Sequence, residues 1–427
     1  MILENWLYNG LIGIQTQNCP PLTKDISCDC LVIGGGFAGL HAALRLIESG
    51  KQVVLVEKTI CGGSSSGKSG GFLTPQTEND IWIIEKNHGK ENGKIIFDIP
   101  QKGVDMIVSI AKKYSFKCDL RKQDSMYLAI KEGDIEELKV EAEVRKKAGL
   151  PYKLYNKKNL ASIHPSKSYF SGMKFSGSYG INSLTYCQEL KNLLIKKGVK
   201  IYEGTEVNKI FKNIALTHRG NIKAKNILVC IDKMKTEFDE EISKKYYHVQ
   251  SFLAVSEPLT KEEKKQIFPK EELMCWDSND LYLHYRIVEN DRIMLGGQSY
   301  LTIFSPNYSY SPKVINNIIA EFKDRFPFLK NLNFTHFWPG LLDVTKDLNP
   351  IADYHPRNKS IQYTLGCAGL PWAAFCGDYI ARRVVDPKTE DLSGFLGINR
   401  KFFISDNLQK YLGKILSFSI SNLRSLY

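Results

Sequence analysis

The sequence predicts an α/β protein, in which a domain built on a parallel sheet is interleaved with an α+β domain built on a mainly antiparallel sheet. Residues 30–57 carry the pattern of a strand, a turn, a helix and a second strand, which is the repeating unit of a parallel sheet. Residues 249–255 and 282–295 alternate like antiparallel strands, the second segment around a polar turn at 289–291. The 427 residues exceed the usual size of one hydrophobic core, so we expect two domains.

The turn inside the first unit has the spacing of a dinucleotide-binding motif. Gly34, Gly36 and Gly39 follow a short apolar run in the pattern G-x-G-x-x-G, and a helical stretch comes next. The first glycine permits a tight turn, the second lets the backbone approach a pyrophosphate, and the third lets helix and strand pack closely. The unpaired N–H groups and the dipole of the helix favour phosphate at this end. The segment therefore predicts a Rossmann-like site for a dinucleotide.

The second strand ends at Glu57, which is placed to accept hydrogen bonds from a pair of ribose hydroxyls. Residues 57–75 then form a loop rich in glycine and serine. Such a loop offers backbone N–H groups and hydroxyls with little side-chain bulk, as an extended dinucleotide requires. A flexible linker has the same composition. The apolar, strand-like residues 72–75 at the end of the loop favour the binding function.

These residues together resemble a known family. The positions that fall on its patterns V-x-G-G-G-x-x-G and E-x-x-x-x-G-x-x-x-S-G-x-x-G-G are Asp29, Gly34 to Gly39, Glu57, Ser66, Gly67, Gly70 and Gly71. The chain thus resembles the D-amino-acid oxidase-like superfamily of FAD-dependent oxidoreductases. It is most similar to the branch with glycine oxidase, sarcosine oxidase and gamma-glutamylputrescine oxidase. Lys68 stands where relatives often have arginine.

Later segments extend the resemblance. Residues 180–210 look like the helix, strand and turn that bring a backbone valine, here Val207, onto the adenine. Residues 281–297 resemble a strand pair of the substrate domain that ends in two glycines. Residues 365–381 resemble the glycine turn and helix that close over the flavin, with Pro371 in place of the last glycine. Proline removes one N–H donor there but is sterically suited to the start of a helix.

The resemblance implies FAD as the cofactor. The residues it assigns to FAD are Gly34, Gly36, Phe37, Ala38, Gly39, Glu57, Lys58, Ser65, Ser66, Gly67, Gly70, Gly71, Val207, Cys230, Gly340, Gly366, Gly369, Leu370 and Pro371. The resemblance also implies a discontinuous FAD-binding domain of residues 1–76, 188–245 and 336–390. The substrate domain would comprise residues 77–187 and 246–335.

The sequence predicts helices over residues 77–115 and 131–147 within the substrate domain. Residues 391–427 carry aromatic and aliphatic side chains at mixed helical spacing. We expect them to form a C-terminal extension that docks on the surface. A helix that lies on a membrane is the alternative for this segment.

The expected chemistry is oxidation of a carbon–nitrogen bond by hydride transfer to the flavin, which carries the redox reaction itself. Alternation places Tyr282, His284 and Arg286 on one face of a strand. From that face Arg286 would bind a substrate carboxylate through its guanidinium fork, while Lys68 would stabilise negative charge near the flavin. The catalytic candidates are therefore Lys68, His284 and Arg286. The alternatives are a surface ion pair for Arg286, a structural hydrogen bond for His284 and a solvent-facing Lys68.

The cysteine content and the charge of the chain indicate which cofactors and which cellular location to expect. The ten cysteines contain no C-x-x-C pair, which argues against zinc ribbons, iron–sulfur clusters and flavoenzymes with a redox disulfide. Scattered cysteines, the absence of a secretory signal and the lack of an apolar run of about 20 residues predict a cytoplasmic protein without a transmembrane segment. The net charge of +12 is spread along the chain, which favours attraction of anionic ligands over nucleic-acid binding.

The sequence contains no second G-x-G-x-x-G, so we expect dioxygen, a quinone or a carrier protein as the electron acceptor rather than a bound nicotinamide. Besides the leading function, two alternatives stay open. The leading interpretation is an FAD-dependent amine or amino-acid oxidoreductase. A hydroxy-acid dehydrogenase on the same fold is the first alternative. An FAD-binding subunit without independent turnover is the second, favoured by the unusual turn at Pro371.

Overall fold

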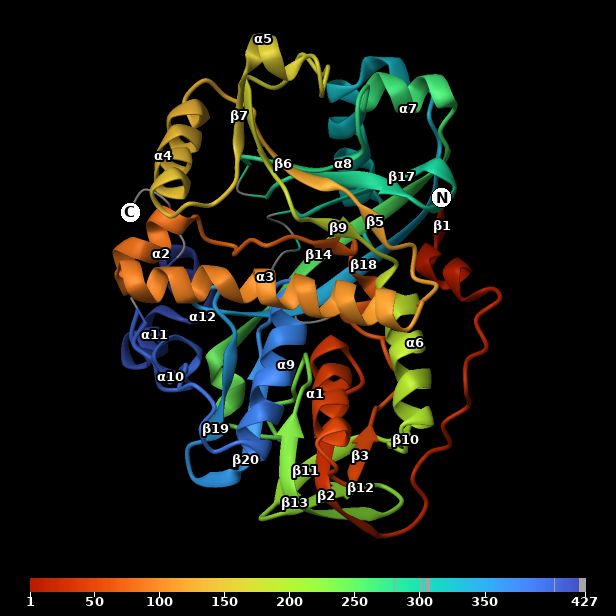
Figure 1. Ribbon diagram of the computed structural model, residues 1–427, viewed down its shortest axis with the longest axis vertical. Helices are drawn as coiled ribbons and strands as arrows, with labels where there is room; N and C mark the ends of the chain where they lie inside the picture. Colours follow the sequence, from red (N-terminus) through yellow and green to blue (C-terminus); the bar gives the residue numbers. More distant parts are fainter. Residues whose placement is uncertain (280, 300–301, 303, 305–307, 403, 422–427) are drawn as a thin grey trace.

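Two large sheets stand one above the other in the computed structural model, and a long helix, α3 (Lys90–Lys113), crosses the molecule between them in the view of Figure 1. The structure describes residues 1–427 except 280, 300, 301, 303, 305–307, 403 and 422–427. The arrangement confirms the expected combination of a parallel and a mainly antiparallel sheet.

The lower sheet in Figure 1 is the parallel one. Its parallel strands, in spatial order, are β10 (Lys200–Tyr202), β3 (Val53–Val56), β2 (Ile26–Ile33), β13 (Asn221–Val229) and β20 (Asn358–Leu365). The antiparallel additions are β11 (Val207–Phe211), β12 (Ile214–Thr217) and β19 (Ile351–His355). Val32 and Leu228 in the central strands are fully buried, as expected for a parallel sheet covered on both faces.

Helices α1 (Phe37–Glu48) and α9 (Leu370–Val385) lie side by side on this sheet (Figure 1). Their backbones approach so closely that a Cβ on Gly377 would lie 2.0 Å from the Ala38 carbonyl oxygen. Only glycine allows this approach. A second close approach joins α3 to the start of α9, because a Cβ on Gly103 would lie 2.1 Å from the Pro371 carbonyl oxygen.

The upper sheet has nine strands and is mainly antiparallel. In spatial order they are β1 (Ile2–Leu3), β18 (Phe334–Thr345), β14 (Tyr246–Pro258), β17 (Arg292–Gly297), β16 (His284–Val288), β15 (Leu273–Asp277), β6 (Asp124–Ala129), β8 (Ser171–Phe175) and β7 (Lys153–Asn156). The expected antiparallel pairing of β16 with β17 is confirmed. Leu283 and Tyr285 face a core shared with α8 (Pro312–Arg325), so the predicted alternation along this segment holds.

The remaining elements connect these layers. They are η1 (Trp6–Leu11), η2 (Ser66–Lys68), β4 (Phe72–Leu73), α2 (Ile81–His88), β5 (Arg121–Lys122), α4 (Asp134–Lys147), α5 (Lys157–Leu160), β9 (Tyr179–Gly180), α6 (Ser183–Lys196), η3 (Ile242–Lys245), α7 (Lys261–Ile267), η4 (Glu289–Asp291), η5 (Pro327–Leu329), α10 (Ser393–Leu396), α11 (Asp406–Leu412) and α12 (Lys414–Ser421). Helices α2, α3 and α4 occupy the two segments in which the sequence predicts helices.

The sheets divide the chain differently from the expected boundaries at two places. Strand β18 pairs with β14 along most of its length, so it belongs to the upper sheet, although the resemblance assigns residues 336–390 to the FAD-binding domain. Strand β1 pairs with β18 and joins the same sheet. The division into domains otherwise stays a prediction.

The C-terminal extension contacts the protein through specific side chains. The Tyr247 hydroxyl donates to Gln409 Oε1 at 2.6 Å, and the Phe418 ring lies 5.2 Å from the Tyr247 ring. Within the described part of the chain, no helix combines the length and apolarity needed to cross a bilayer. The ten cysteines all lie in described segments and are free, and all but Cys367 are buried.

The close packing of α1 against α9 at Gly377 can be tested by substitution. Replacing Gly377 with Ala forces a methyl group against a backbone carbonyl, so the helices must move apart. We expect the free energy of unfolding to fall by about 1–3 kcal/mol, the usual cost of overpacking. Gly394→Ala is the matched control, since a Cβ there meets nothing within 4 Å. Chemical denaturation of both variants measures the difference, and equal stabilities would contradict the tight contact.

Candidate functional site

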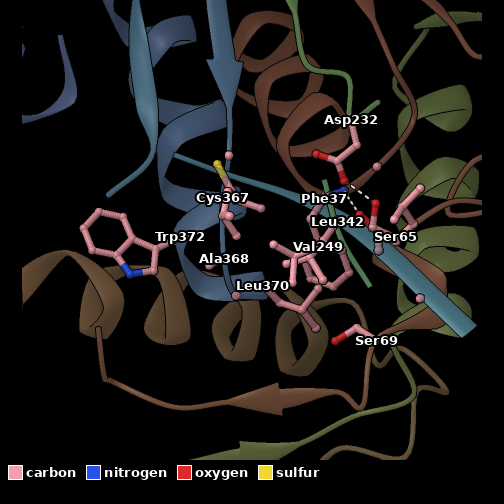
Figure 2. Close-up of a pocket in the computed structure, with 18 of the residues that line it drawn as sticks. Phe37, Ser65, Ser69, Asp232, Val249, Leu342, Cys367, Ala368, Leu370 and Trp372 are labelled. Carbon is pink, nitrogen blue, oxygen red and sulfur yellow. Dashed lines mark hydrogen bonds between the residues drawn. The ribbon is translucent and has the colours of Figure 1, made fainter. Parts of the chain in front are cut away.

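A large cavity lined by residues of both sheets extends from the parallel sheet to α4. Its volume is about 1010 Å³, which lies at the upper end of the roughly 300–1,000 Å³ of small-molecule and cofactor pockets. Figure 2 shows Phe37, Ser65 and Asp232 gathered in one part of it, with Leu370, the first residue of α9, and Ala368 of the preceding turn nearby. The cavity therefore has room for an extended ligand.

The turn between β2 and α1 opens onto this cavity. Gly34 has a φ of +108°, a backbone conformation that favours glycine. A Cβ on Gly39 would lie 1.9 Å from the Gly34 carbonyl oxygen, so helix and strand touch there. Gly36 is the N-cap of α1 and gives the helix no side-chain cap, while the Phe37 N–H donates to Ser66 Oγ at 3.1 Å. The positive end of α1 thus faces the cavity, as an anion site requires.

Glu57 directly follows β3 and lines the cavity. Its Oε2 accepts from the Gly35 N–H at 2.8 Å, and its Oε1 accepts from the Thr59 N–H at 2.9 Å and the Thr59 hydroxyl at 3.0 Å. These donors hold the carboxylate beside the glycine turn. The side chain is in the position that the spacing predicts for a residue binding ribose.

The loop rich in glycine and serine is ordered by side chains from other elements. The Ser65 hydroxyl donates to Asp232, and Lys233 Nζ donates to Ser64 Oγ at 2.6 Å. The Lys68 carbonyl accepts from Trp338 Nε1 at 3.0 Å. The loop is therefore a built part of the cavity wall rather than a flexible linker.

A second turn, which precedes α9, also opens onto the cavity. Gly366 and Gly369 have φ values of +64° and +103°, and α9 begins at Leu370 without a side-chain cap. Pro371 is the second residue of this helix, where a backbone N–H would have no partner within the helix. The proline therefore costs no helical hydrogen bond, and it leaves one N–H fewer at this end of the helix.

Most residues that the sequence assigns to FAD line the cavity, and three do not. The residues that line it are Gly34, Gly36, Phe37, Ala38, Glu57, Lys58, Ser65, Ser66, Gly70, Val207, Cys230, Gly340, Gly366, Gly369, Leu370 and Pro371. Gly39, Gly67 and Gly71 do not line it, because each is packed against another backbone. A Cβ on each of them would lie 1.9, 2.0 and 1.9 Å, respectively, from a carbonyl oxygen. These three glycines shape the loops by close packing.

Arg286 is buried beside the cavity but does not line it. Its Nε donates to the Gly70 carbonyl at 2.7 Å, and its Nη2 donates to the Ile181 carbonyl at 2.7 Å. Its Nη1 donates to Gln123 Oε1 at 3.3 Å and to the Ile287 carbonyl at 3.2 Å. The side chain is 1% exposed. Oxygens of the protein thus satisfy the guanidinium, which corrects both expectations for it, a fork on a substrate carboxylate and a surface ion pair.

His284 and Lys68 both line the cavity. The His284 ring lies edge-on to Phe72 at 5.4 Å and 5.6 Å from the Tyr282 ring. Burial lowers the pKa of His284 to about 4, so the imidazole is neutral at physiological pH. Lys68 Nζ lies 4.3 Å from the centroid of the Tyr308 ring, in a cation–π contact.

A comparison with known protein families agrees with this geometry. The family model of FAD dependent oxidoreductases (DAO) matches residues 29–383. The chain belongs to this family.

Two curated relatives match this FAD-dependent oxidoreductase along more than four fifths of their own length. A protein named probable oxidoreductase OrdL from Haemophilus influenzae is 28% identical over 90% of this chain and 89% of its own. The gamma-glutamylputrescine oxidoreductase of Escherichia coli is 24% identical over 82% of this chain and 81% of its own. Glycine oxidase from Geobacillus kaustophilus superposes with a TM-score of 0.76 at 16% identity, over 88% of this chain and 99% of its own. That likeness shows the shared fold.

The residues of the cavity fit FAD. Gly36 leaves the backbone open at the uncapped N-terminus of α1, where a Cβ would lie 2.8 Å from Ser66 Oγ. Glu57 stands beside this turn as an acceptor, and the uncapped N-terminus of α9 faces the same cavity. Two uncapped helix N-termini and a carboxylate acceptor thus share one continuous space, which is the set of groups that a phosphate- and ribose-containing cofactor requires.

Sequence reasoning missed several lining residues. Asp232 and Lys233 follow β13 closely, and polar residues at the carboxyl end of a parallel strand are a signal that predicts them. Burial raises the pKa of Asp232 to about 6. Phe418 of α12 also lines the cavity and packs 5.5 Å from the Phe304 ring. The C-terminal extension is therefore part of the cavity wall, and no sequence pattern marks this.

The contribution of the glycine turn of this FAD-dependent oxidoreductase to FAD affinity can be tested at Gly36. Replacing Gly36 with Ala places a methyl group at the N-cap of α1, 2.8 Å from Ser66 Oγ, on the backbone that the glycine motif predicts to approach the diphosphate. We expect the Kd for FAD to rise by at least about tenfold, which corresponds to about 1.4 kcal/mol. Titration of the apoprotein with FAD, followed by flavin fluorescence, measures it. Gly133→Ala, where a Cβ meets nothing within 4 Å, is the control, and an unchanged Kd for Gly36→Ala would remove the phosphate role.

Proposed function

We propose that the protein oxidises the carbon–nitrogen bond of an amine or amino acid with FAD. The observation that supports this most strongly is that the cavity continues past the glycine turns into a compartment lined by Tyr282, His284 and aromatic residues of the upper sheet. This compartment offers a substrate site that is continuous with the nucleotide site. Among the matched proteins, gamma-glutamylputrescine oxidoreductase and glycine oxidase carry an amine and an amino acid in their names.

When bound, FAD would accept the α-hydrogen of the substrate as a hydride, and water would hydrolyse the imine that this leaves. The protein holds the substrate carbon in line, and positioning of this kind lowers the barrier. Phe72, Trp276 and Tyr127 provide walls that exclude water. His284 stays neutral and orients the substrate by hydrogen bonding rather than by charge. Lys68 places a cation at the cavity wall that stabilises developing negative charge.

A panel of substrates tests the proposed reaction. The purified flavoprotein is mixed without oxygen with alkyl amines, N-methyl amino acids or hydroxy acids, and the visible absorbance of the flavin is followed. We expect amines or amino acids to bleach the flavin and hydroxy acids to leave it oxidised. Bleaching by hydroxy acids alone would instead favour the hydroxy-acid dehydrogenase. Bound flavin that no compound reduces would favour the FAD-binding subunit without turnover.

The role proposed for Lys68 has a separate test. Replacing Lys68 with Met removes the cation at the cavity wall but keeps a long side chain. We expect reoxidation of the reduced flavin by dioxygen to slow by at least about tenfold, because negative charge that develops on oxygen loses its partner. Stopped-flow mixing of the reduced protein with oxygenated buffer measures the rate. Lys388→Met on the exposed surface is the control, and equal rates in all three proteins would remove the role.

A further inference from the structure

Glu78 has an unusual position in the substrate compartment. It lies in the loop between β4 and α2, and it lines the cavity with surface that a ligand can reach. Among the residues that the structure describes, none forms a hydrogen bond or an ion pair with its carboxylate. Glu78 is exposed to the cavity space, and the walls around its carboxyl group raise the pKa of that group by desolvation, a cost that a bound cation would offset. The side chain is therefore placed to serve a ligand rather than the fold.

The compartment that Glu78 shares has aromatic walls. The Trp276 ring stacks 6.2 Å from the Tyr127 ring and 6.3 Å from the Phe175 ring, and all three residues line the cavity. Tyr282 lines it as well. The negative charge of Glu78 is the main cause that raises the pKa of the Tyr282 hydroxyl, because the two groups lie near each other. Aromatic faces together with a carboxylate form a favourable environment for an organic cation.

The arginines of this region are already paired. Arg145 Nε donates to Glu141 Oε1 at 2.9 Å, and Arg145 Nη2 donates to Gln76 Oε1 at 2.7 Å. Arg286 donates to protein oxygens and does not line the cavity. Glu141 offsets the charge of Arg145, and Arg286 is bonded to carbonyls outside the cavity lining, so neither arginine pairs with the Glu78 carboxylate.

Lys58, Lys68, Lys233 and Lys235 line the cavity, and two of them, Lys68 and Lys233, are held together at one aromatic ring. Lys68 Nζ lies 4.3 Å and Lys233 Nζ 5.8 Å from the centroid of the Tyr308 ring, so the two ammonium groups share one ring. Lys233 Nζ also donates to Ser64 Oγ in the glycine- and serine-rich loop. These two cations are therefore held beside the loop that faces the nucleotide part of the cavity.

We propose that Glu78 is the counter-ion for a second, non-reacting ammonium group of the substrate, held between the carboxylate and the aromatic walls of Tyr282, Trp276 and Tyr127. The substrate is then an alkyl diamine or a related aminoalkyl amine rather than an α-amino acid. This inference rests on the function proposed above, and it deepens that function by assigning a substrate class from the charge of the site.

Two physical arguments favour this class. The carboxylate of an α-amino acid is bound most strongly by an arginine fork, and protein oxygens engage Nε and Nη2 of both Arg145 and Arg286. In addition, a carboxylate raises the pKa of a neighbouring ammonium and keeps it protonated. A protonated amine has no lone pair to assist the departure of a hydride. Glu78 therefore suits an ammonium that anchors the substrate and does not react.

A comparison of a diamine with a monoamine tests the proposal. The probes are diaminobutane, with an amine at each end, and butylamine, with one. Binding to the oxidised holoenzyme is measured from the perturbation of the flavin spectrum, and anaerobic flavin reduction gives the rate. We expect diaminobutane to bind at least about tenfold more tightly than butylamine, because the second ammonium gains an ion pair and cation–π contacts.

Substitution of Glu78 then identifies the residue responsible. In Glu78→Gln, we expect the Kd for diaminobutane to rise by about tenfold and to approach that for butylamine, whose own Kd stays within about twofold. Glu78→Asp should retain part of the preference. Glu132→Gln on the exposed surface is the matched control and should bind both probes like the unmodified protein. Flavin content and Tm of each variant verify that the fold is intact.

The outcomes separate this inference from the proposed function. If amines reduce the flavin but Glu78→Gln leaves the preference for diaminobutane unchanged, or if N-methylglycine binds more tightly than diaminobutane, the inference is wrong and the proposed function stands. If no amine reduces the flavin but diaminobutane still binds in a manner that depends on Glu78, the cation site stands and the proposed function is wrong.

Discussion

Helices α1 and α9 touch along their backbones, and the geometry of the whole site follows from this contact. Gly377 brings the two backbones together at Ala38, so both helices lie side by side on the parallel sheet. Both helices lack a side-chain cap, and the residues at both starts line one cavity. Two positive helix ends thus converge on a space that suits an anionic cofactor. A third helix, α3, secures the arrangement because Gly103 packs against the Pro371 carbonyl.

A buried cation joins the two halves of the site. The Arg286 guanidinium binds the carbonyls of Gly70 and Ile181, and so ties the end of the glycine-rich loop to a strand of the upper sheet. Burial lowers its pKa to about 10, which leaves it charged at physiological pH. Charge-assisted hydrogen bonds to several carbonyls offset the cost of burying this charge. Arg286 therefore stabilises the cavity wall without lining the cavity, and other residues must recognise the substrate.

The substrate compartment and the nucleotide part of the cavity differ in chemistry. The nucleotide part has the backbone N–H groups of two helix starts and the hydroxyls of the serine-rich loop, which suit phosphates. The substrate part has stacked aromatic rings, a neutral His284 and the carboxylate of Glu78. One continuous cavity therefore offers an anionic ligand and a cationic ligand separate places. The C-terminal extension adds Phe418 to this wall, which joins the end of the described chain to the site.

Local spacing in the sequence was enough to predict the turn at Gly34, the position of Glu57 and the hairpin of β16 and β17. Neighbours along the chain set the geometry of these features, so patterns of a few residues reveal them. The contacts that these features make with distant segments could be seen only in the folded chain. Alternation placed His284 and Arg286 on one face, but carbonyls from distant segments draw Arg286 away from the cavity. Membership of β18 in the upper sheet and the place of Glu78 likewise depend on contacts between distant segments, which local patterns do not encode.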